Sequence, residues 1–395
     1  MQNVLIKLAR SFDGNHIPYQ FTGGAALFLQ GVKIDEWDQV HILIQWDVFE
    51  TAYSLVSSLS PSEIERTSSH AQFFITMGEI PVCMECKFNT TIRTDPYRIS
   101  VKIDDLDIWV TSLYSLIYNQ ELQQRYRLSI QQFLKSKQDE ITLQNQKAWN
   151  QDQYNDLIER YGEQNELAEK IKKNPEWRLH PFYPYLGDLK NKKVIHLLGS
   201  NGIKGTALAL LGADVSIVDF SEENAMYAIK LAEAAKVKLE YITGDVFSIK
   251  DQMENTADLV LMELGVLHYF MDLKPLFCMI EKILKQEGRF VLHEFHPIST
   301  KLITSSGKKH NVTGNYFNPS IEELNVAFSK HLSEEKQKNL AKVKQRKWTL
   351  GEIITSAAQA GLTIKVLEEE PNHKIHDIGL PKTFTLVTEK ISPNL

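Results

Sequence analysis

The sequence contains few cysteines and no long apolar run. Its only cysteines are Cys83, Cys86 and Cys278, too few for a disulfide framework and in keeping with a reducing compartment. Its longest apolar stretches, such as 259–262, are far shorter than the roughly 18 residues that a membrane-spanning helix needs. The N-terminus also lacks the apolar region and cleavage site of a secretory signal. We therefore predict a cytoplasmic protein without a membrane partner.

Positive charge is not in excess either. Lysine and arginine number 44 against 50 aspartates and glutamates, which gives a net charge of −6. Because basic residues supply most of the non-specific affinity for phosphate backbones, no nucleic-acid partner is predicted. The composition is globular, and 395 residues are too many for one ordinary core. We expect two folding units and a small-molecule partner, and leave a homodimer open.

Cys83 and Cys86 form a CxxC motif, a pattern that elsewhere binds zinc or performs redox chemistry. No second pair completes a four-thiolate site. The surrounding segment IPVCMECKF is typical of a strand, in which positions i and i+3 face opposite sides. A structural role is favoured, and no metal site is predicted.

Residues 1–118 are predicted to form a small α/β domain. Helix-like stretches near 4–12 and 48–57 alternate with the strand-like runs YQFTG, VHILIQW, QFFITM and VCMECKF. Residues 119–145 are rich in Gln, Glu, Lys and Leu with almost no Gly or Pro, which predicts a helical connector.

Residues 146–395 are predicted to form a second α/β domain. The apolar runs KVIHLLG, DVSIVDF, KLEYITGD, ADLVLMELG and RFVLHEF are separated by amphipathic helices expected at 203–211, 222–235 and 273–285. This alternation predicts βαβ units and a parallel sheet covered on both faces. A helix at 348–360 and two closely spaced strands, LTIKVLEEE and TFTLVTEK, follow.

The first strand and helix of this domain enclose a glycine-containing turn. In doubly wound folds the ligand lies outside the carboxyl ends of the strands, and Gly199 and Gly202 leave room for it there. Asp219 follows Gly199 by 20 residues and ends the second strand, where a carboxylate reaches ribose hydroxyls. Alternatively, Asp219 and Ser221 only cap the helix that starts at Glu222.

Two further features favour a nucleoside site. The third strand ends in Asp245, which is suited to the exocyclic amine of adenine, and the fourth ends in the turn from Glu263 to Gly265. In order, these motifs resemble those of class I S-adenosylmethionine-dependent methyltransferases. LVLMELGVLHYF, FVLHEFHP, RKWTLGEI and HDIGLPKTFTLV are similar to the small-molecule branch. The resemblance implies a Rossmann-like sheet of seven strands, the last inserted antiparallel, with S-adenosylmethionine as cofactor.

The predicted cofactor-binding residues are Gly199, Ser200, Asn201, Gly202, Asp219, Phe220, Asp245, Val246, Glu263, Leu264 and Gly265. The first motif departs from the family pattern. His196 stands at the usual acidic position, and Leu198 and Ser200 replace two glycines. The group that holds the methionine amino group is therefore left open.

Methyl transfer from a sulfonium requires mainly that the acceptor atom be held close and in line. If the acceptor is a hydroxyl, a base must accept its proton. His268, Glu294 and His296 are the candidates on strands four and five, although each is equally compatible with a structural hydrogen bond.

In small-molecule members of the family, helices before the first strand close over the cleft. Here that implies Trp149, Tyr154, Arg160 and Tyr161, with an aromatic stacking on the substrate and Arg160 meeting a carboxylate. The alternative is a helix that packs its aromatics into the core. The insertion at 297–347 is a second predicted substrate element.

The segment FTGGAALFLQGVKIDEWDQVHILIQWD resembles the opening motif of nucleotidyltransferase-like domains, in which a Gly-Gly turn precedes a strand bearing Asp-x-Asp. Alternate strand residues share a face, so two carboxylates there hold magnesium. In this chain Gln39 and His41 occupy those positions, and neither suits a hard cation. We predict an inactive domain that serves docking, association or regulation. A non-catalytic nucleoside-binding scaffold and a bifunctional nucleotidyltransferase-methyltransferase stay as alternatives.

Overall fold

A computed structural model describes most of the chain, in two compact units. The described residues are 1–117, 119, 122–151, 153–249, 253–306, 309–327, 329, 340–371 and 379–391. The first unit comprises Met1–Ser136 with Phe317–Pro319, and the second Lys137–Tyr316 with Ser320–Leu395. The predicted connector corresponds largely to helix α5 (Gln124–Trp149), and the division between the units falls within it.

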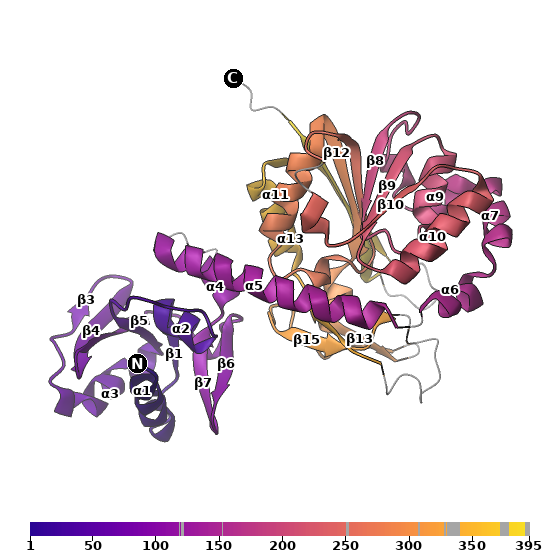
Figure 1. The fold of residues 1–395 in the computed structure, drawn as a ribbon. Helices are drawn as coiled ribbons and strands as arrows, with labels where there is room; N and C mark the ends of the chain where they lie inside the picture. The colour runs from indigo at the N-terminus through magenta and orange to yellow at the C-terminus, as the bar shows by residue number, and fades with distance from the viewer. Residues whose placement is uncertain are drawn as a thin grey trace. The chain divides into compact units, whose positions relative to one another are not determined.

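The first unit contains a seven-stranded mixed sheet in the order β3-β4-β5-β2-β1-β7-β6 (Figure 1). Its strands are β1 (Tyr19–Thr22), β2 (Val40–Ile44), β3 (Glu65–Arg66), β4 (His70–Met77), β5 (Ile80–Lys87), β6 (Arg98–Ile103) and β7 (Leu106–Thr111). Its helices include α1 (Gln2–Gly14), α2 (Gly23–Leu29), α3 (Phe49–Leu55) and α4 (Leu113–Ile117). The four predicted strands are present. The CxxC cysteines lie on β5, and both are buried.

The second unit contains a seven-stranded sheet in the order β10-β9-β8-β11-β12-β18-β17. Its strands are β8 (Lys193–Leu197), β9 (Asp214–Asp219), β10 (Glu240–Thr243), β11 (Ala257–Glu263), β12 (Leu284–Phe295), β17 (Leu362–Pro371) and β18 (Pro381–Lys390). Strand β18 lies antiparallel between β12 and β17. The predicted Rossmann-like methyltransferase sheet is therefore confirmed.

Helices cover both faces of this sheet. In Figure 1, α11 (Leu273–Ile283) and α13 (Leu350–Gln359) lie on one side, and α9 (Ile203–Leu210), α10 (Glu222–Ala235) and α7 (Gln164–Lys173) on the other. The helix predicted at 273–285 ends two residues early, because β12 begins at Leu284 and pairs with Ala257. The short α6 (Gln153–Tyr161) and α8 (Pro175–Arg178) precede the first strand.

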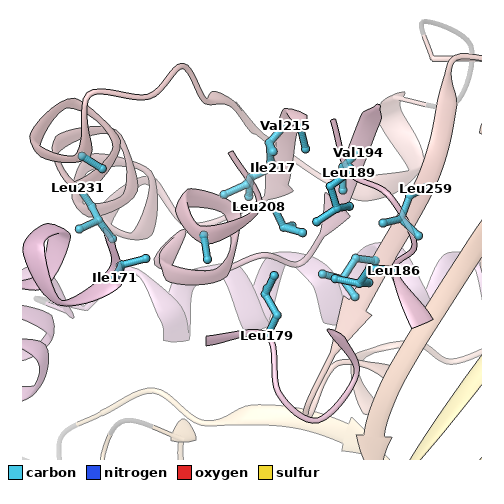
Figure 2. Packing of buried hydrophobic residues seen from close by; sticks show 14 of the residues in the cluster. Ile171, Leu179, Leu186, Leu189, Val194, Leu208, Val215, Ile217, Leu231 and Leu259 are labelled. Atoms are coloured by element: carbon cyan, nitrogen blue, oxygen red, sulfur yellow. The ribbon is translucent and has the colours of Figure 1, made fainter. Parts of the chain in front are cut away.

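In the core beneath the predicted ligand turn, α9 packs closely against β9 and α10 (Figure 2). Leu208 of α9 and Ile217 of β9 are fully buried in it. Two glycines permit this approach: a Cβ at Gly205 would lie 2.6 Å from Ile217, and one at Gly202 would lie 2.5 Å from the Cβ of Ala228. Close packing therefore fixes the start of α9.

The insertion at 297–347 is only partly described. It contains the hairpin β13 (Ile303–Ser306) with β14 (Lys309–Val312) and the pair β15 (Ile321–Leu324) with β16 (Val343–Arg346). Part of the HDIGLPKTFTLV motif, residues 376–378, lies outside the described residues. Among the helices that are described, none combines the length and apolarity needed to cross a bilayer.

Candidate active site

A cleft of about 580 Å³ opens at the carboxyl ends of β8, β9 and β11. This is the position expected for a ligand in a doubly wound sheet, and the volume is within the roughly 300–1,000 Å³ typical of small-molecule sites. The lining residues are Trp149, Arg160, Tyr161, Trp177, Arg178, His180, Leu198, Gly199, Ser200, Asn201, Ile203, Lys204, Asp219, Phe220, Asn224, Glu263, Leu264, Gly265, Val266 and Tyr269.

The turn after β8 forms the floor of this cleft. Leu198 and Ser200, which replace family glycines, both adopt left-handed backbone conformations, with φ of 51° and 49°. Such conformations are unfavourable for residues with a Cβ. The carbonyl of Ser200 accepts a hydrogen bond from the Tyr241 hydroxyl at 2.9 Å. The turn therefore adopts left-handed backbone conformations at two positions that are not glycine.

Asp219 joins this turn to the second helix. Its Oδ2 accepts from the backbone N–H of Ser200 at 3.1 Å, and its Oδ1 accepts from that of Ser221 at 2.9 Å. Ser221 caps α10 by accepting from the N–H of Asn224. The capping alternative is thus correct for Ser221, whereas Asp219 also lines the cleft. Burial raises the pKa of Asp219 to about 6, against the lowering effect of these hydrogen bonds.

His196 lies beneath the turn and is fully buried. Neither ring nitrogen has a hydrogen-bond partner among the described residues, and Nε2 lies 3.9 Å from Glu263 Oε1. Burial, with the charge of Lys204, lowers its pKa to about 3. The residue at the family's acidic position is therefore a neutral imidazole.

Lys204 and Glu263 form an ion pair that lines the cleft. Lys204 extends from the first turn of α9, and Glu263 is the last residue of β11. Burial lowers the pKa of Lys204 to about 8, which leaves it cationic at neutral pH. One cation and one anion are thus presented together beside the glycine turn.

A smaller space adjoins the cleft and shares Asp219, Phe220, Leu198 and Tyr269 with it. Asp245 and Val246, predicted to meet adenine, line this space. The Asp245 carboxylate accepts from the N–H of Phe247 at 2.9 Å, and burial raises its pKa. Of the eleven predicted cofactor residues, only Gly202 lines neither space, and its role is the packing described above.

The three predicted bases do not line the cleft. Glu294 is buried and accepts hydrogen bonds from the backbone N–H groups of Gly265 at 2.5 Å, Val266 at 2.9 Å and Leu267 at 3.2 Å. Burial raises its pKa, against these hydrogen bonds. Its carboxylate therefore holds the turn after β11 in place.

His296 and His268 also contact protein groups outside the cleft lining or pack against a neighbouring ring. His296 Nδ1 accepts from the N–H of Ile298 at 3.1 Å, and its Nε2 lies 2.7 Å from Glu369. The His268 ring packs edge-on against Tyr269 at 4.5 Å, and burial lowers its pKa to about 3. Glu294 and His296 thus make the structural hydrogen bonds of the alternative interpretation, whereas His268 shows only aromatic packing.

Three of the four predicted substrate residues line the cleft, namely Trp149, Arg160 and Tyr161. Trp149 donates from its indole nitrogen to the Tyr269 hydroxyl at 3.1 Å. Tyr154 lies elsewhere: its hydroxyl contacts Lys230 at 2.8 Å and its ring packs against Tyr227. The packing alternative therefore holds for Tyr154. No described residue of the 297–347 insertion lines the cleft.

Several lining residues were not predicted from the sequence. They are Trp177, Arg178, His180, Leu198, Ile203, Lys204, Asn224, Val266 and Tyr269. Lys204 stands in the first turn of the helix after the glycine turn, which was a usable signal. The segment around Trp177 precedes the first strand at no fixed spacing, so the sequence held no comparable signal for it.

The first unit has a cleft of its own, of about 290 Å³, beside the Gly-Gly turn. Gln39 and His41 line it together with Glu85 of β5. His41 Nε2 lies 2.8 Å from Glu85 Oε2. Hydrogen bonding from His41 lowers the pKa of Glu85. The histidine thus contacts one of the carboxylates that line this cleft.

Comparison with known proteins bears on the second unit. Residues 198–292 match the family model of the methyltransferase domain. Among curated proteins, none matches the chain. A Mesorhizobium loti S-adenosylmethionine-dependent methyltransferase structure is 17% identical (TM-score 0.43), covering 55% of this chain and 99% of that one. A putative one from Listeria monocytogenes is 21% identical, with the same TM-score and coverage.

A magnesium protoporphyrin IX methyltransferase from Synechocystis, solved with S-adenosylhomocysteine, is 13% identical (TM-score 0.37), covering 61% of this chain and 95% of that one. Because all three identities are low, the functional assignment depends on the family match and the cleft. The second unit carries a methyltransferase domain.

Proposed function

We propose that the protein transfers the methyl group of S-adenosylmethionine to a small-molecule acceptor bound in the cleft of the second unit. The observation that carries this proposal is the convergence of Asp219, the glycine turn and the Lys204–Glu263 pair on one cleft at the carboxyl ends of the strands. A carboxylate suits the vicinal hydroxyls of a ribose because it accepts from both at once.

The methionine part of the cofactor is a zwitterion, and the cleft offers a matching pair of charges. Glu263 is suited to the ammonium that the family's acidic residue would otherwise meet, and Lys204 to the carboxylate. His196, neutral and buried, cannot supply the missing negative charge. On this proposal the anion has moved from β8 to the end of the adjacent β11.

The bound cofactor supplies an electrophilic methyl group on its sulfonium. The residues of the chain hold the acceptor in line with that group, which lowers the barrier without a protein nucleophile. If the acceptor is a hydroxyl, His180 is the imidazole that lines the cleft and is exposed to receive the proton.

The experiment that tests methyl transfer uses the whole protein. A cell extract is incubated with the protein and methyl-labelled S-adenosylmethionine, and labelled products are sought by mass spectrometry. We expect a labelled product of low molecular mass that requires the protein. Failure of calorimetry to detect S-adenosylhomocysteine binding below about 100 μM, a free energy of roughly 5–6 kcal/mol, would overturn the proposal.

For the first unit we propose a nucleotidyltransferase-like domain without transferase activity, which serves docking, association or regulation. The contact between His41 and Glu85 supports it, since the histidine engages a carboxylate that a magnesium site would need. Incubation with magnesium, a labelled nucleoside triphosphate and candidate acceptors should show no transfer. Turnover that His41→Ala abolishes would favour the bifunctional alternative. A cytoplasmic location, a homodimer and the absence of a nucleic-acid partner stay predictions.

A further inference from the structure

One wall of the methyltransferase cleft is both aromatic and cationic. It is built by the segment before β8, and its residues Arg160, Tyr161, Trp177, Arg178 and His180 all line the cleft. Trp177 is 65% exposed, an unusual environment for the largest side chain. The guanidinium of Arg178 lies 5.1 Å from the centre of the Trp177 ring, and that of Arg160 lies 4.9 Å from that of Tyr161.

The two guanidinium groups on this wall have no acidic partner among the described residues. Among the ion pairs of the described residues, neither Arg160 nor Arg178 takes part. The remaining cation of the cleft, Lys204, is already paired with Glu263. Asp219 accepts hydrogen bonds from the backbone N–H groups of Ser200 and Ser221, and the proposed function assigns it to the ribose.

The cofactor does not supply the missing negative charge. S-adenosylmethionine carries one carboxylate against an ammonium and a sulfonium, so its binding adds net positive charge to the cleft. Arg160 and Arg178 then face a cationic ligand unless another anion enters. Uncompensated like charges in a partly enclosed site are unfavourable.

We infer, building on the proposed function, that the methyl acceptor is an anionic molecule with a flat apolar face. Its carboxylate, sulfonate or phosphate is bound by Arg160 and Arg178, whose planar guanidinium groups favour bidentate contacts with such oxyanions. Its flat face stacks on Trp177, which the cation–π contact with Arg178 holds in place. These residues determine acceptor specificity.

A matched pair of fluorescent probes tests this inference. The dye 8-anilinonaphthalene-1-sulfonate has an aromatic face and one anionic group, and N-phenyl-1-naphthylamine has the same rings without the sulfonate. Each is titrated into the full-length protein with and without S-adenosylhomocysteine. We expect the sulfonate dye to bind at least tenfold more tightly, and the double variant R160Q/R178Q to abolish that preference.

Two controls make the result specific. R10Q removes an exposed arginine from α1, and it should leave the dye preference unchanged. Trp177→Ala should weaken both dyes alike, because it removes the stacking surface and leaves the charges. Two measurements show that R160Q/R178Q is folded. Its melting curve should resemble that of the parent protein, and its affinity for S-adenosylhomocysteine should lie within threefold of the parent's.

Equal binding of the two dyes, a preference that survives R160Q/R178Q, or no dye binding at all would overturn the inference. So would a tenfold loss of S-adenosylhomocysteine affinity in folded R160Q/R178Q, since the arginines would then bind the cofactor carboxylate. Absence of S-adenosylhomocysteine binding to the parent protein overturns the proposed function instead, and the dye preference is then judged from the titrations without it.

Discussion

Each of the two units places a glycine-containing strand–helix turn beside acidic side chains. The two units differ in what the carboxylates of these side chains contact. In the first unit, Gly23 follows β1 with a φ of 56°, and the neighbouring carboxylate of Glu85 lies against His41. In the second, the turn at 198–202 follows β8. Asp219 and Glu263 line the cleft of about 580 Å³, and Asp245 lines the smaller space beside it.

This difference shows that residue type alone does not make a binding site. A carboxylate serves a ligand through lone pairs that its own protein leaves available. Hydrogen bonding from His41 lowers the pKa of Glu85, so this carboxylate is already stabilised as an ion by the protein. Asp219 has the opposite shift, because burial raises its pKa to about 6. It therefore gains from a ligand that favours the ionised form.

The most direct test of this difference between the two units is to remove the Asp219 carboxylate. Asp219→Ala should weaken S-adenosylhomocysteine binding by about a hundredfold or more, since two charged hydrogen bonds to the ribose contribute roughly 1.5–3 kcal/mol each. Calorimetry measures this loss. Asp214→Ala, at the exposed start of the same strand, is the matched control and should bind normally. Unchanged affinity in Asp219→Ala would move the ribose contact elsewhere.

A change of pH tests the same carboxylate without mutation. The folded-state pKa of about 6 lies above the ordinary 3.8, so between these values the folded protein holds a proton that the unfolded chain lacks. The stability contributed by this group is therefore present below pH 3.8 and is lost as pH rises through 6. Cofactor binding needs the ionised form and shows the reverse dependence.

We expect S-adenosylhomocysteine affinity to fall by up to about tenfold per unit below pH 6. Calorimetry at pH 5, 6 and 7.5 measures the slope. In Asp219→Asn the slope should be smaller, and an equal slope there would assign the pH dependence to another group.

Glu263→Gln tests whether Glu263 on β11 takes the place of the acidic residue that the family has on the first strand. If Glu263 meets the methionine ammonium, its neutralisation should weaken S-adenosylhomocysteine binding by about tenfold, which corresponds to roughly 1.4 kcal/mol. The matched control is Glu233→Gln on the exposed face of α10, which should have no effect. Adenosine, which lacks the amino-acid part of the cofactor, should bind both variants equally. A loss of adenosine affinity in Glu263→Gln would contradict the assignment.

The smallest effects are expected from one substitution in each of the two turns, measured as changes in the free energy of unfolding. Gly23→Ser places a side chain at a φ of 56° and should destabilise the first unit by about 1 kcal/mol. Ser200→Gly relieves a φ of 49° but makes the unfolded chain more flexible. Its free energy of unfolding should rise by less than about 1 kcal/mol. Chemical denaturation measures both, and a destabilised Ser200→Gly would show that the serine side chain contributes to the turn.

The alternation of apolar strands and amphipathic helices was sufficient to predict the second sheet, because each pattern has its own period and parallel strands need crossover helices. The cofactor turn and the acidic residues at three strand ends were predictable for the same reason. In the first unit, β3, β6 and β7 were missed. The burial of β6 alternates between exposed and half-buried positions, so its apolar pattern is weak.

The fold of the second unit and the positions of Asp219, Asp245 and Glu263 at strand ends could be predicted from the sequence, because they follow from periodicity and spacing along the chain. The cofactor class was predicted from the resemblance of the motifs to a known family. Only the tertiary structure decided how side chains distant in sequence are used. It assigned Glu294 to the backbone of the turn at 265–267 and His296 to Glu369. It also brought Arg178 and Lys204 to one cleft, because such contacts depend on packing between elements that no local pattern records.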